Sequence, residues 1–192
     1  MSIIPSSILL EAYRMGIFPM AESADAEEVN WYSARKRGII PLNTFRLSRR
    51  DQRSIRSAGF TPGINKDFKG VIEGCAARES TWISDNLKKS FMALNEKGSA
   101  HSVEVYLDEK LVGGLYGVAI GGAFFAESMF QTEKEAMKAA LLFCHRHLVL
   151  KGFVLWDVQF YTDHLGRFGC VEISSRAYEK ILKDALKIRA VF

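Results

Sequence analysis

The chain has 192 residues, of which 48% are hydrophobic and 25% charged, and it carries a net charge of +4 with a pI near 9.0. These values fit a soluble globular protein with one main core and exclude a largely disordered chain. The longest uncharged stretch, residues 111–126, contains five glycines, so we read it as two strands and not as a membrane span.

The basic charge balance is compatible with a polyanionic partner but does not require one. The three cysteines, Cys75, Cys144 and Cys170, make an odd number without metal-ligand spacing. We expect reduced structural thiols, which are typical of a cytoplasmic protein.

The first part of the chain predicts one short helix followed by irregular segments. Ser6 and Ser7 can cap a helix that runs to about Met15. The next segments are expected to be an apolar loop, an exposed acidic loop and a basic turn, at residues 17–20, 21–30 and 35–37.

Polar residues at suitable positions predict three further helices before residue 100. Ser48 and Asp51 form a capping-box pattern, Asn65 can cap a helix to about residue 77, and Ser84 can cap a third helix. The inward face of this third helix is predicted to consist of Leu87, Phe91 and Leu94.

From His101 the apolar period changes from helical to two, which predicts three consecutive strands. A second capping box, Thr132 with Glu135, is expected to open a helix to about residue 150. A strand around residues 152–160, a loop and a final helix after Ser175 complete the chain. This order predicts a mixed α/β (α+β) fold in which the last strand pairs inside the sheet, and it resembles the core of GNAT-type acyltransferases.

The strand at residues 152–160 carries two polar side chains that an apolar strand would not need. Asp157 and Gln159 are two residues apart, so strand alternation directs them to one side of the sheet. An unpaired buried polar group costs about 1–3 kcal/mol, so both need a partner or a ligand. One alternative is purely structural, with Asp157 paired to an arginine or to the backbone. A second polar element, Glu127 and Ser128, lies one helix earlier.

The predicted helix after Ser48 has a basic face made by Arg49, Arg53 and Arg56. This face is either solvated surface or a site for a nucleic-acid backbone. The junction at residues 127–135 between a strand and a helix has no glycine and is acidic, which disfavours binding of the coenzyme A pyrophosphate.

Several motifs, spread from Ile8 to Tyr178, resemble those of the leucyl/phenylalanyl-tRNA–protein transferase family. They are Ala12–Pro19, Trp31–Ser33, Val71–Ala76, Thr81–Ile83, Ala100–Val105, Leu111–Ala119, Glu127–Phe130, Asp157–Gln159 and Asp163–His164. The resemblance implies a GNAT-like fold with a small N-terminal domain. We therefore expect a small domain at residues 1–60, carrying the basic helix, and a catalytic domain at residues 61–192.

The resemblance also implies an activity: transfer of Leu or Phe from aminoacyl-tRNA to proteins that begin with Arg or Lys, which marks them for N-degron proteolysis. Asp157 and Gln159 would be the catalytic pair that positions and activates the attacking amine, and Glu127 would orient the amine or the basic acceptor side chain. Because the aminoacyl ester is already activated, no cofactor or metal is implied. The sequence leaves open which group accepts the proton.

The resemblance assigns binding roles to further residues. Those expected to bind the aminoacyl group or acceptor are Trp82, Leu115, Phe124, Ser128, Met129 and Cys144. Those expected to bind tRNA are Met20, Arg49, Arg53 and Arg56. Met20 stands where the family has a Trp, and Cys144 where it has a Phe, so the amino-acid preference is open.

Two other classes of function compete with this one. The first is a GNAT-type acyltransferase with another activated donor, or a related tRNA-dependent transferase with acidic N-terminal acceptors. The second is a tRNA- or degron-binding protein without catalytic activity.

Overall fold

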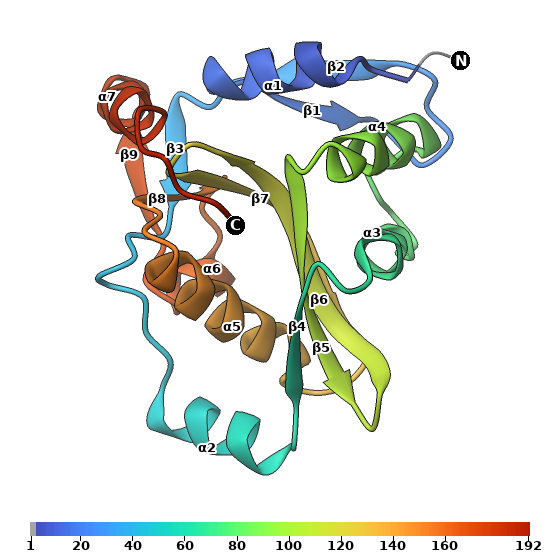
Figure 1. Cartoon of the computed structure of the whole chain (residues 1–192), viewed down its shortest axis with the longest axis vertical. Helices are drawn as coiled ribbons and strands as arrows, with labels where there is room; N and C mark the ends of the chain where they lie inside the picture. The colour runs from blue at the N-terminus through green and yellow to red at the C-terminus, as the bar shows by residue number, and fades with distance from the viewer. Residues whose placement is uncertain (1–2) are drawn as a thin grey trace.

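The computed structural model describes residues 3–192 and contains a seven-stranded sheet and a separate two-stranded hairpin (Figure 1). The strands are β1 (Phe18–Ala21), β2 (Val29–Tyr32), β3 (Lys36–Ile39), β4 (Thr61–Ile64), β5 (Ala100–Leu107), β6 (Lys110–Ile120), β7 (Ala123–Gln131), β8 (Leu155–Gln159) and β9 (Val171–Ser174). The helices are α1 (Ser6–Arg14), α2 (Arg49–Ser57), α3 (Phe68–Ala76), α4 (Asp85–Glu96), α5 (Ala136–Leu150), α6 (Asp163–Gly166) and α7 (Ser175–Ala185).

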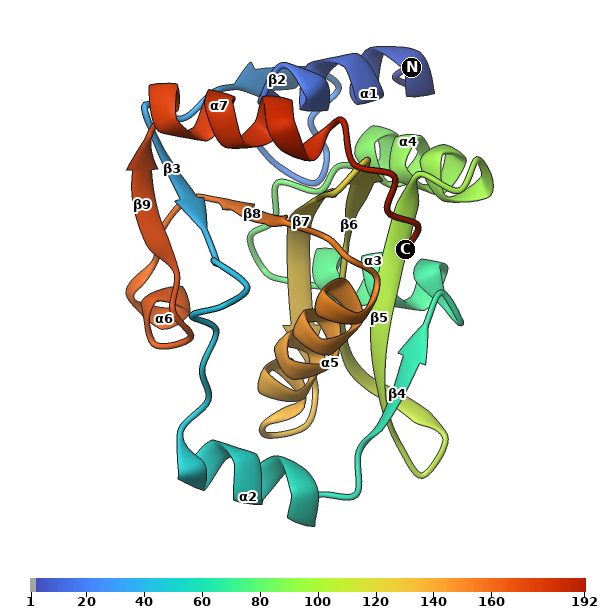
Figure 2. The same ribbon diagram turned by 60° about the vertical axis from the view of Figure 1, so that its left-hand side comes forward.

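The large sheet has the strand order β4-β5-β6-β7-β8-β3-β9. Its strands are antiparallel to their neighbours except for β7 and β8, which are parallel and joined through α5 (Figure 2). The predicted three-strand meander is present, and β8 lies inside the sheet between β7 and β3. The mixed α/β prediction is therefore confirmed.

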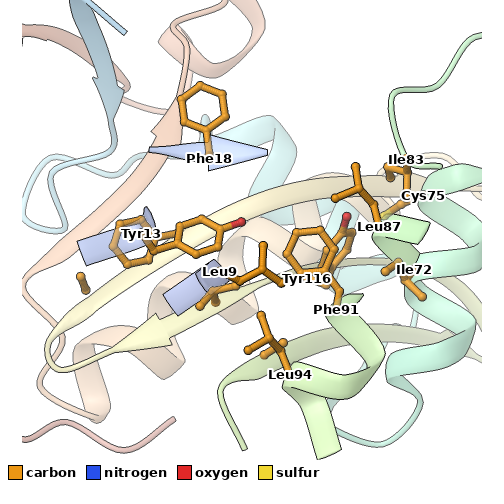
Figure 3. Close-up of a cluster of buried hydrophobic side chains, with 14 of the residues drawn as sticks. Leu9, Tyr13, Phe18, Ile72, Cys75, Ile83, Leu87, Phe91, Leu94 and Tyr116 are labelled. Atoms are coloured by element: carbon orange, nitrogen blue, oxygen red, sulfur yellow. The ribbon is translucent and has the colours of Figure 1, made fainter. Parts of the chain in front are cut away.

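The sheet has a hydrophobic core on each face. Helices α1, α3, α4 and α7 contribute to one core, and α5 contributes to the other. Figure 3 shows the first core, in which Leu9 and Tyr13 of α1 lie beside Tyr116 of β6 and Phe91 of α4. The predicted inward face of α4 is confirmed, because Leu87, Phe91 and Leu94 are fully buried.

The expectation of irregular structure between residues 17 and 37 is confirmed only for the acidic loop, of which residues 22–28 are irregular and mostly exposed; it is wrong for the segments on either side. Strands β1 and β2 form an antiparallel hairpin, and β3 joins the large sheet where a basic turn was expected. Gly38 permits this pairing because a Cβ atom there would lie 2.6 Å from the carbonyl carbon of Phe160. The short strand β9, within the expected loop before α7, was also not predicted.

The capping predictions have mixed outcomes. Ser48 and Ser84 each accept a hydrogen bond from the backbone N–H three residues later, as predicted. Asn65 does not begin a helix: it follows β4 and its side chain accepts from the N–H of Ser102, while Asp67 caps α3. Helix α5 begins only at Ala136, since the Thr132 hydroxyl donates to the carbonyl of Val112 on β6.

The division into domains at residue 60 stays a prediction. Residues 36–39, which belong to the expected N-terminal part, form β3 in the large sheet. Among the residues described, no helix combines the length and apolar character needed to cross a membrane.

Candidate active site

A small cavity lies where the parallel strands β7 and β8 stop pairing. Their last paired residues are Phe125 and Asp157, and both strands continue beyond this pair. The cavity has a volume of about 90 Å³ and is lined by Leu115, Ala126, Glu127, Ser128, Met129, Leu141, Trp156, Val158, Gln159 and Leu165. Its lining is mostly apolar, with Glu127, Ser128 and Gln159 as the polar members.

Glu127 is the extra residue of a β-bulge. On β6, Tyr116 pairs with Ser128 and Gly117 pairs with Ala126, so Glu127 has no partner in the register. Gly117 permits the close approach of the strands here, because a Cβ atom at this position would lie 2.2 Å from the carbonyl oxygen of Phe125. A bulge breaks the alternation of a strand and can redirect a side chain, as is common beside active sites.

The side chains of Glu127 and Gln159 meet across the end of the strand pair. Nε2 of Gln159 donates to Oε1 of Glu127 at 3.1 Å. Burial raises the pKa of Glu127 to about 8; the charge of Asp157 acts in the same direction, and Tyr13 and Arg37 act against it. At neutral pH the Glu127 carboxyl can therefore gain or lose a proton with little cost, as a general acid or base requires.

Asp157 is fully buried and does not line the cavity. Its carboxylate accepts from Nε of Arg37 at 2.9 and 3.1 Å and from Nη2 of Arg37 at 2.8 Å. It also accepts from the hydroxyl of Tyr178 and from the backbone N–H of Gln159, the latter at 2.8 Å. The geometry thus includes the structural alternative considered from the sequence, an acid paired with an arginine.

Arg37 is the partner that satisfies the buried Asp157 charge, and only 1% of it is exposed. Nη1 of Arg37 donates to the carbonyl of Gly16 at 2.9 Å, and its guanidinium lies 4.7 Å from the ring centre of Phe18 and 4.6 Å from that of Tyr178. Burial lowers the pKa of Arg37, but the charge and hydrogen bonds of Asp157 outweigh this effect and raise it above its ordinary value.

Gln159 ends β8 with a backbone φ of +58°, in the left-handed region that non-glycine residues rarely adopt. The hydrogen bond from its N–H to Oδ1 of Asp157 holds this conformation. The position of the Gln159 side chain is therefore set by Asp157 and not by strand alternation alone.

The structure brings together only some of the residues predicted to bind the aminoacyl group. Leu115, Ser128 and Met129 line the cavity with Glu127 and Gln159. Phe124 and Cys144 do not line the cavity, because both are fully buried in the same hydrophobic core as α5.

Trp82 and the predicted tRNA-binding residues lie outside the cavity. Trp82 packs against the other core, and its carbonyl accepts from the N–H of Ala21 at the end of β1. Met20 is half-buried in β1. Arg49, Arg53 and Arg56 are exposed on α2, which lies at the opposite end of the molecule from β1 in Figure 1.

Sequence reasoning missed Arg37 and did not give a site role to Tyr13 or Tyr178. Arg37 was assigned to a turn, although it is followed by the apolar residues Gly38-Ile39-Ile40, which is a signal for a charged residue entering a buried strand. The Tyr13 hydroxyl is fully buried near Glu127, and burial together with the Glu127 charge raises its pKa.

Two family models match this chain. That of the leucyl/phenylalanyl-tRNA protein transferase matches residues 39–183, and that of the N-terminal domain of the same enzyme matches residues 6–35. A leucyl/phenylalanyl-tRNA–protein transferase of Rhodopseudomonas palustris (strain HaA2) is 47% identical over 193 residues, which cover 98% of this chain and 86% of the relative.

The solved structures that resemble the chain are much more distant in sequence. The crystal structure of FemX has a TM-score of 0.50 at 12% identity, covering 91% of this chain and 64% of that one. A ribosomal-protein-alanine N-acetyltransferase from Brucella melitensis biovar Abortus 2308 has a TM-score of 0.36 at 12% identity, covering 49% and 74%. At such identities the likeness concerns the fold alone.

Proposed function

The chain belongs to the leucyl/phenylalanyl-tRNA protein transferase family, whose members are aminoacyltransferases, and we propose that it transfers leucyl or phenylalanyl groups to proteins that begin with Arg or Lys. Its substrates are aminoacyl-tRNA and a protein N-terminus. The observation that supports the proposed site is the Gln159–Glu127 hydrogen bond at the edge of an apolar cavity.

In this proposal the cavity holds the side chain of the donor amino acid. Leu115, Met129, Leu141, Trp156 and Val158 provide apolar walls without charge. Phe124 and Cys144 belong to the same buried core and would support these walls from behind. Burial of an aliphatic side chain in such a space stabilises binding by about 1.5–3 kcal/mol.

The polar residues at the cavity would act on the reacting groups. The neutral α-amine of the acceptor attacks the ester carbonyl, the amide bond forms, and the ester bond to the terminal ribose of the tRNA breaks. The Gln159 side-chain oxygen can accept a hydrogen bond from the amine. We assign acceptance of the amine proton to Glu127, because its pKa of about 8 is close to that of a protein N-terminus. Glu127, ionised before the attack, then gives this proton to the ribose oxygen as it leaves, so the proton lost by the amine ends on the tRNA hydroxyl.

Asp157 has a positioning role in this proposal. Its oxygens are occupied by Arg37, Tyr178 and the N–H of Gln159, so it would act through the placement of Gln159. Its negative charge also raises the pKa of Glu127. Asp157 and Gln159 thus remain a functional pair, in which only Gln159 reaches the substrate.

For tRNA we propose the basic face of α2 as the binding surface. The single acid of this helix, Asp51, is already paired with Lys138 of α5 at 2.5 Å, so the helix presents a net positive face. Met20 would contact the end of the tRNA, and Trp82 would belong to the site for the aminoacyl group or acceptor, as the resemblance implies. Because aminoacyl-tRNA is the donor, we place the reaction in the cytoplasm, and its product would be a substrate of N-degron proteolysis.

The start of α5 disfavours an acyl-coenzyme A donor. The N–H of Ala136 donates to the carbonyl of Glu133, and the N–H of Met137 donates to the side chain of Gln131. Two N–H groups that a pyrophosphate would need are thus occupied, and Glu133 and Glu135 lie beside them.

A transfer assay tests the proposal. The protein is incubated with leucyl-tRNA or phenylalanyl-tRNA and with peptides that differ only in an N-terminal Arg, Lys, Asp or Glu. Mass spectrometry should detect one added leucyl or phenylalanyl group on the Arg and Lys peptides. Transfer to the Asp and Glu peptides alone would contradict the proposed acceptors, and no transfer to any peptide would contradict the proposed function.

A further inference from the structure

A larger hollow of about 690 Å³ lies between α2 and α5, helices that face each other at the lower end of the molecule in Figures 1 and 2. It is distinct from the cavity between β7 and β8, because α5 separates the two. Leu141 of α5 lines the cavity, whereas the residues that follow it, Leu142 and Phe143, line the hollow. We call this space the α2–α5 groove.

The groove is positively charged. Arg46, Arg56 and Arg146 line it together with His145, and none of the lining residues is acidic. None of the three guanidinium groups has a carboxylate within ion-pair distance among residues 3–192. The groove therefore presents three uncompensated positive charges, which favour an anionic occupant.

Aromatic rings also line the groove. Phe45, Phe60 and Phe143 contribute to its walls, and all three are half-buried. A surface that bound only the outer backbone of an RNA duplex would need positive charges but not rings. Aromatic rings beside arginines are typical of sites for single-stranded nucleic acid, where bases stack on rings and phosphates meet guanidinium groups.

Aromatic packing connects the groove with the cavity. The ring of Phe45 lies 4.4 Å from that of His145 and 5.7 Å from that of Trp156, measured between centroids. Trp156 lines the cavity, and Phe45 lines the groove. A strand bound in the groove would therefore lie one layer of side chains from the site proposed for the aminoacyl group.

We propose that the α2–α5 groove binds unpaired nucleotides of the tRNA, with bases against Phe143 and its neighbouring rings and phosphates on Arg46, Arg56 and Arg146. This inference rests on the proposed function for the identity of the RNA. It assigns a binding site to the space between the two helices, in addition to the exposed face of α2, and Arg56 belongs to both.

Direct binding tests the groove with the full-length protein. Fluorescence anisotropy is measured with a labelled single-stranded RNA of about five nucleotides, within the range of known single-strand sites, and with an RNA hairpin duplex. Phe143→Ala should weaken single-strand binding at least about five-fold, the lower end of the effect of one lost base–ring stack, and leave duplex binding within about two-fold. Phe143→Tyr, which keeps the ring, should bind like the parent. If Phe143→Ala unfolds, Phe143→Leu takes its place.

Charge is tested with a matched pair of variants. Arg146→Gln should weaken binding of the single strand, whereas Arg176→Gln, on the exposed face of α7, should not. Leucyl-adenosine lacks the nucleotides proposed to enter the groove, so Phe143→Ala and Arg146→Gln should impair transfer from leucyl-tRNA more than transfer from leucyl-adenosine. The proposal is overturned if the parent does not bind the single strand, if Phe143→Ala binds it as the parent does, or if Arg146→Gln and Arg176→Gln behave alike. Absence of transfer in the parent would contradict the proposed function, and the binding data would still decide whether the groove binds RNA.

Discussion

The guanidinium of Arg37 and the carboxylate of Asp157 form a buried pair whose hydrogen bonds measure 2.8, 2.9 and 3.1 Å, across a sequence separation of 120 residues. Their side chains are 1% and 0% exposed. The pair joins β3 to β8 at the strand that holds Gln159. It therefore links the stability of the sheet to the geometry of the proposed site.

Loss of Arg37 should destabilise the fold strongly. Arg37→Met leaves Asp157 buried without its partner, which is expected to lower the free energy of unfolding by about 3–5 kcal/mol in urea denaturation. The control Lys36→Met removes an exposed charge from the same strand and should cost less than about 1 kcal/mol. The double variant Arg37→Met/Asp157→Leu should recover part of the loss. Equal effects of Arg37→Met and Lys36→Met would contradict a structural role for the pair.

Removal of the Gln159 side chain should affect activity more than stability. Gln159→Ala and Gln159→Gly keep the backbone N–H that binds Asp157 but lose the proposed contact with the amine, so kcat should fall about 100-fold or more in both. Because φ is +58° here, Gln159→Gly should be about 1 kcal/mol more stable than Gln159→Ala. A kcat within about two-fold of the parent's would contradict the assignment of Gln159.

The raised pKa of Glu127 predicts a pH-dependent stability. The folded protein holds a proton on Glu127 up to about pH 8, whereas the ordinary pKa of Glu is 4.5. The contribution of the protonated Glu127 to the free energy of unfolding is therefore fully present below about pH 4.5 and is lost as the pH rises to about 8. Urea denaturation should show the stability difference between the parent and Glu127→Gln falling over this range and staying constant above it. Glu73→Gln, at an exposed position of α3, should give no such trend, and a constant difference for Glu127→Gln would argue against the raised pKa.

Charge reversal on α2 should weaken tRNA binding. Arg53→Glu is expected to raise the KM for aminoacyl-tRNA and to reduce the slope of log affinity against log salt by about 1 or more, because fewer counterions are released. Arg176→Glu, on exposed α7, provides a control with the same change of charge. An unchanged salt slope for Arg53→Glu would exclude the α2 face as a tRNA contact.

The size of the cavity should set the preference for the donor amino acid. The cavity measures about 90 Å³, whereas an engineered apolar cavity that binds benzene in another protein measures ~150 Å³. The small volume therefore favours a leucyl over a phenylalanyl side chain. Met129→Ala should enlarge it and raise the ratio of kcat/KM for phenylalanyl-tRNA over leucyl-tRNA by about 10-fold. Met92→Ala, which changes a half-buried Met outside the cavity, should leave the ratio unchanged. An unaltered ratio in Met129→Ala would mean that the side chain binds elsewhere.

Local signals predicted those parts of the fold that depend on neighbours in sequence. Ser48 and Ser84 cap their helices because their partners lie three residues away, and the alternation after His101 predicted the meander. Predictions failed where a distant group competed. The Thr132 hydroxyl binds a carbonyl 20 residues earlier, and Asn65 binds an N–H 37 residues later, so neither begins a helix.

The site could be predicted to a similar extent. The polar residues in an apolar strand identified Asp157 and Gln159, and both are buried at the end of β8. The sequence could not show that Arg37 occupies the Asp157 carboxylate, because the pairing depends on the register of β3 between β8 and β9. It also could not show that a bulge places Glu127 beside Gln159, since a bulge depends on the pairing of two strands.

The position of β3 between β8 and β9 also has a consequence for the order of events during synthesis. Its neighbours in the sheet are translated more than a hundred residues later, so β3 cannot complete its pairing while the nascent chain grows. At about 5–20 residues per second, the 120 residues between Arg37 and Asp157 take about 6–24 s to make. During this interval Arg37 keeps its hydration, and the edge of β3 is free to pair with other strands. Completion of the sheet, with its high contact order, therefore awaits the last part of the chain.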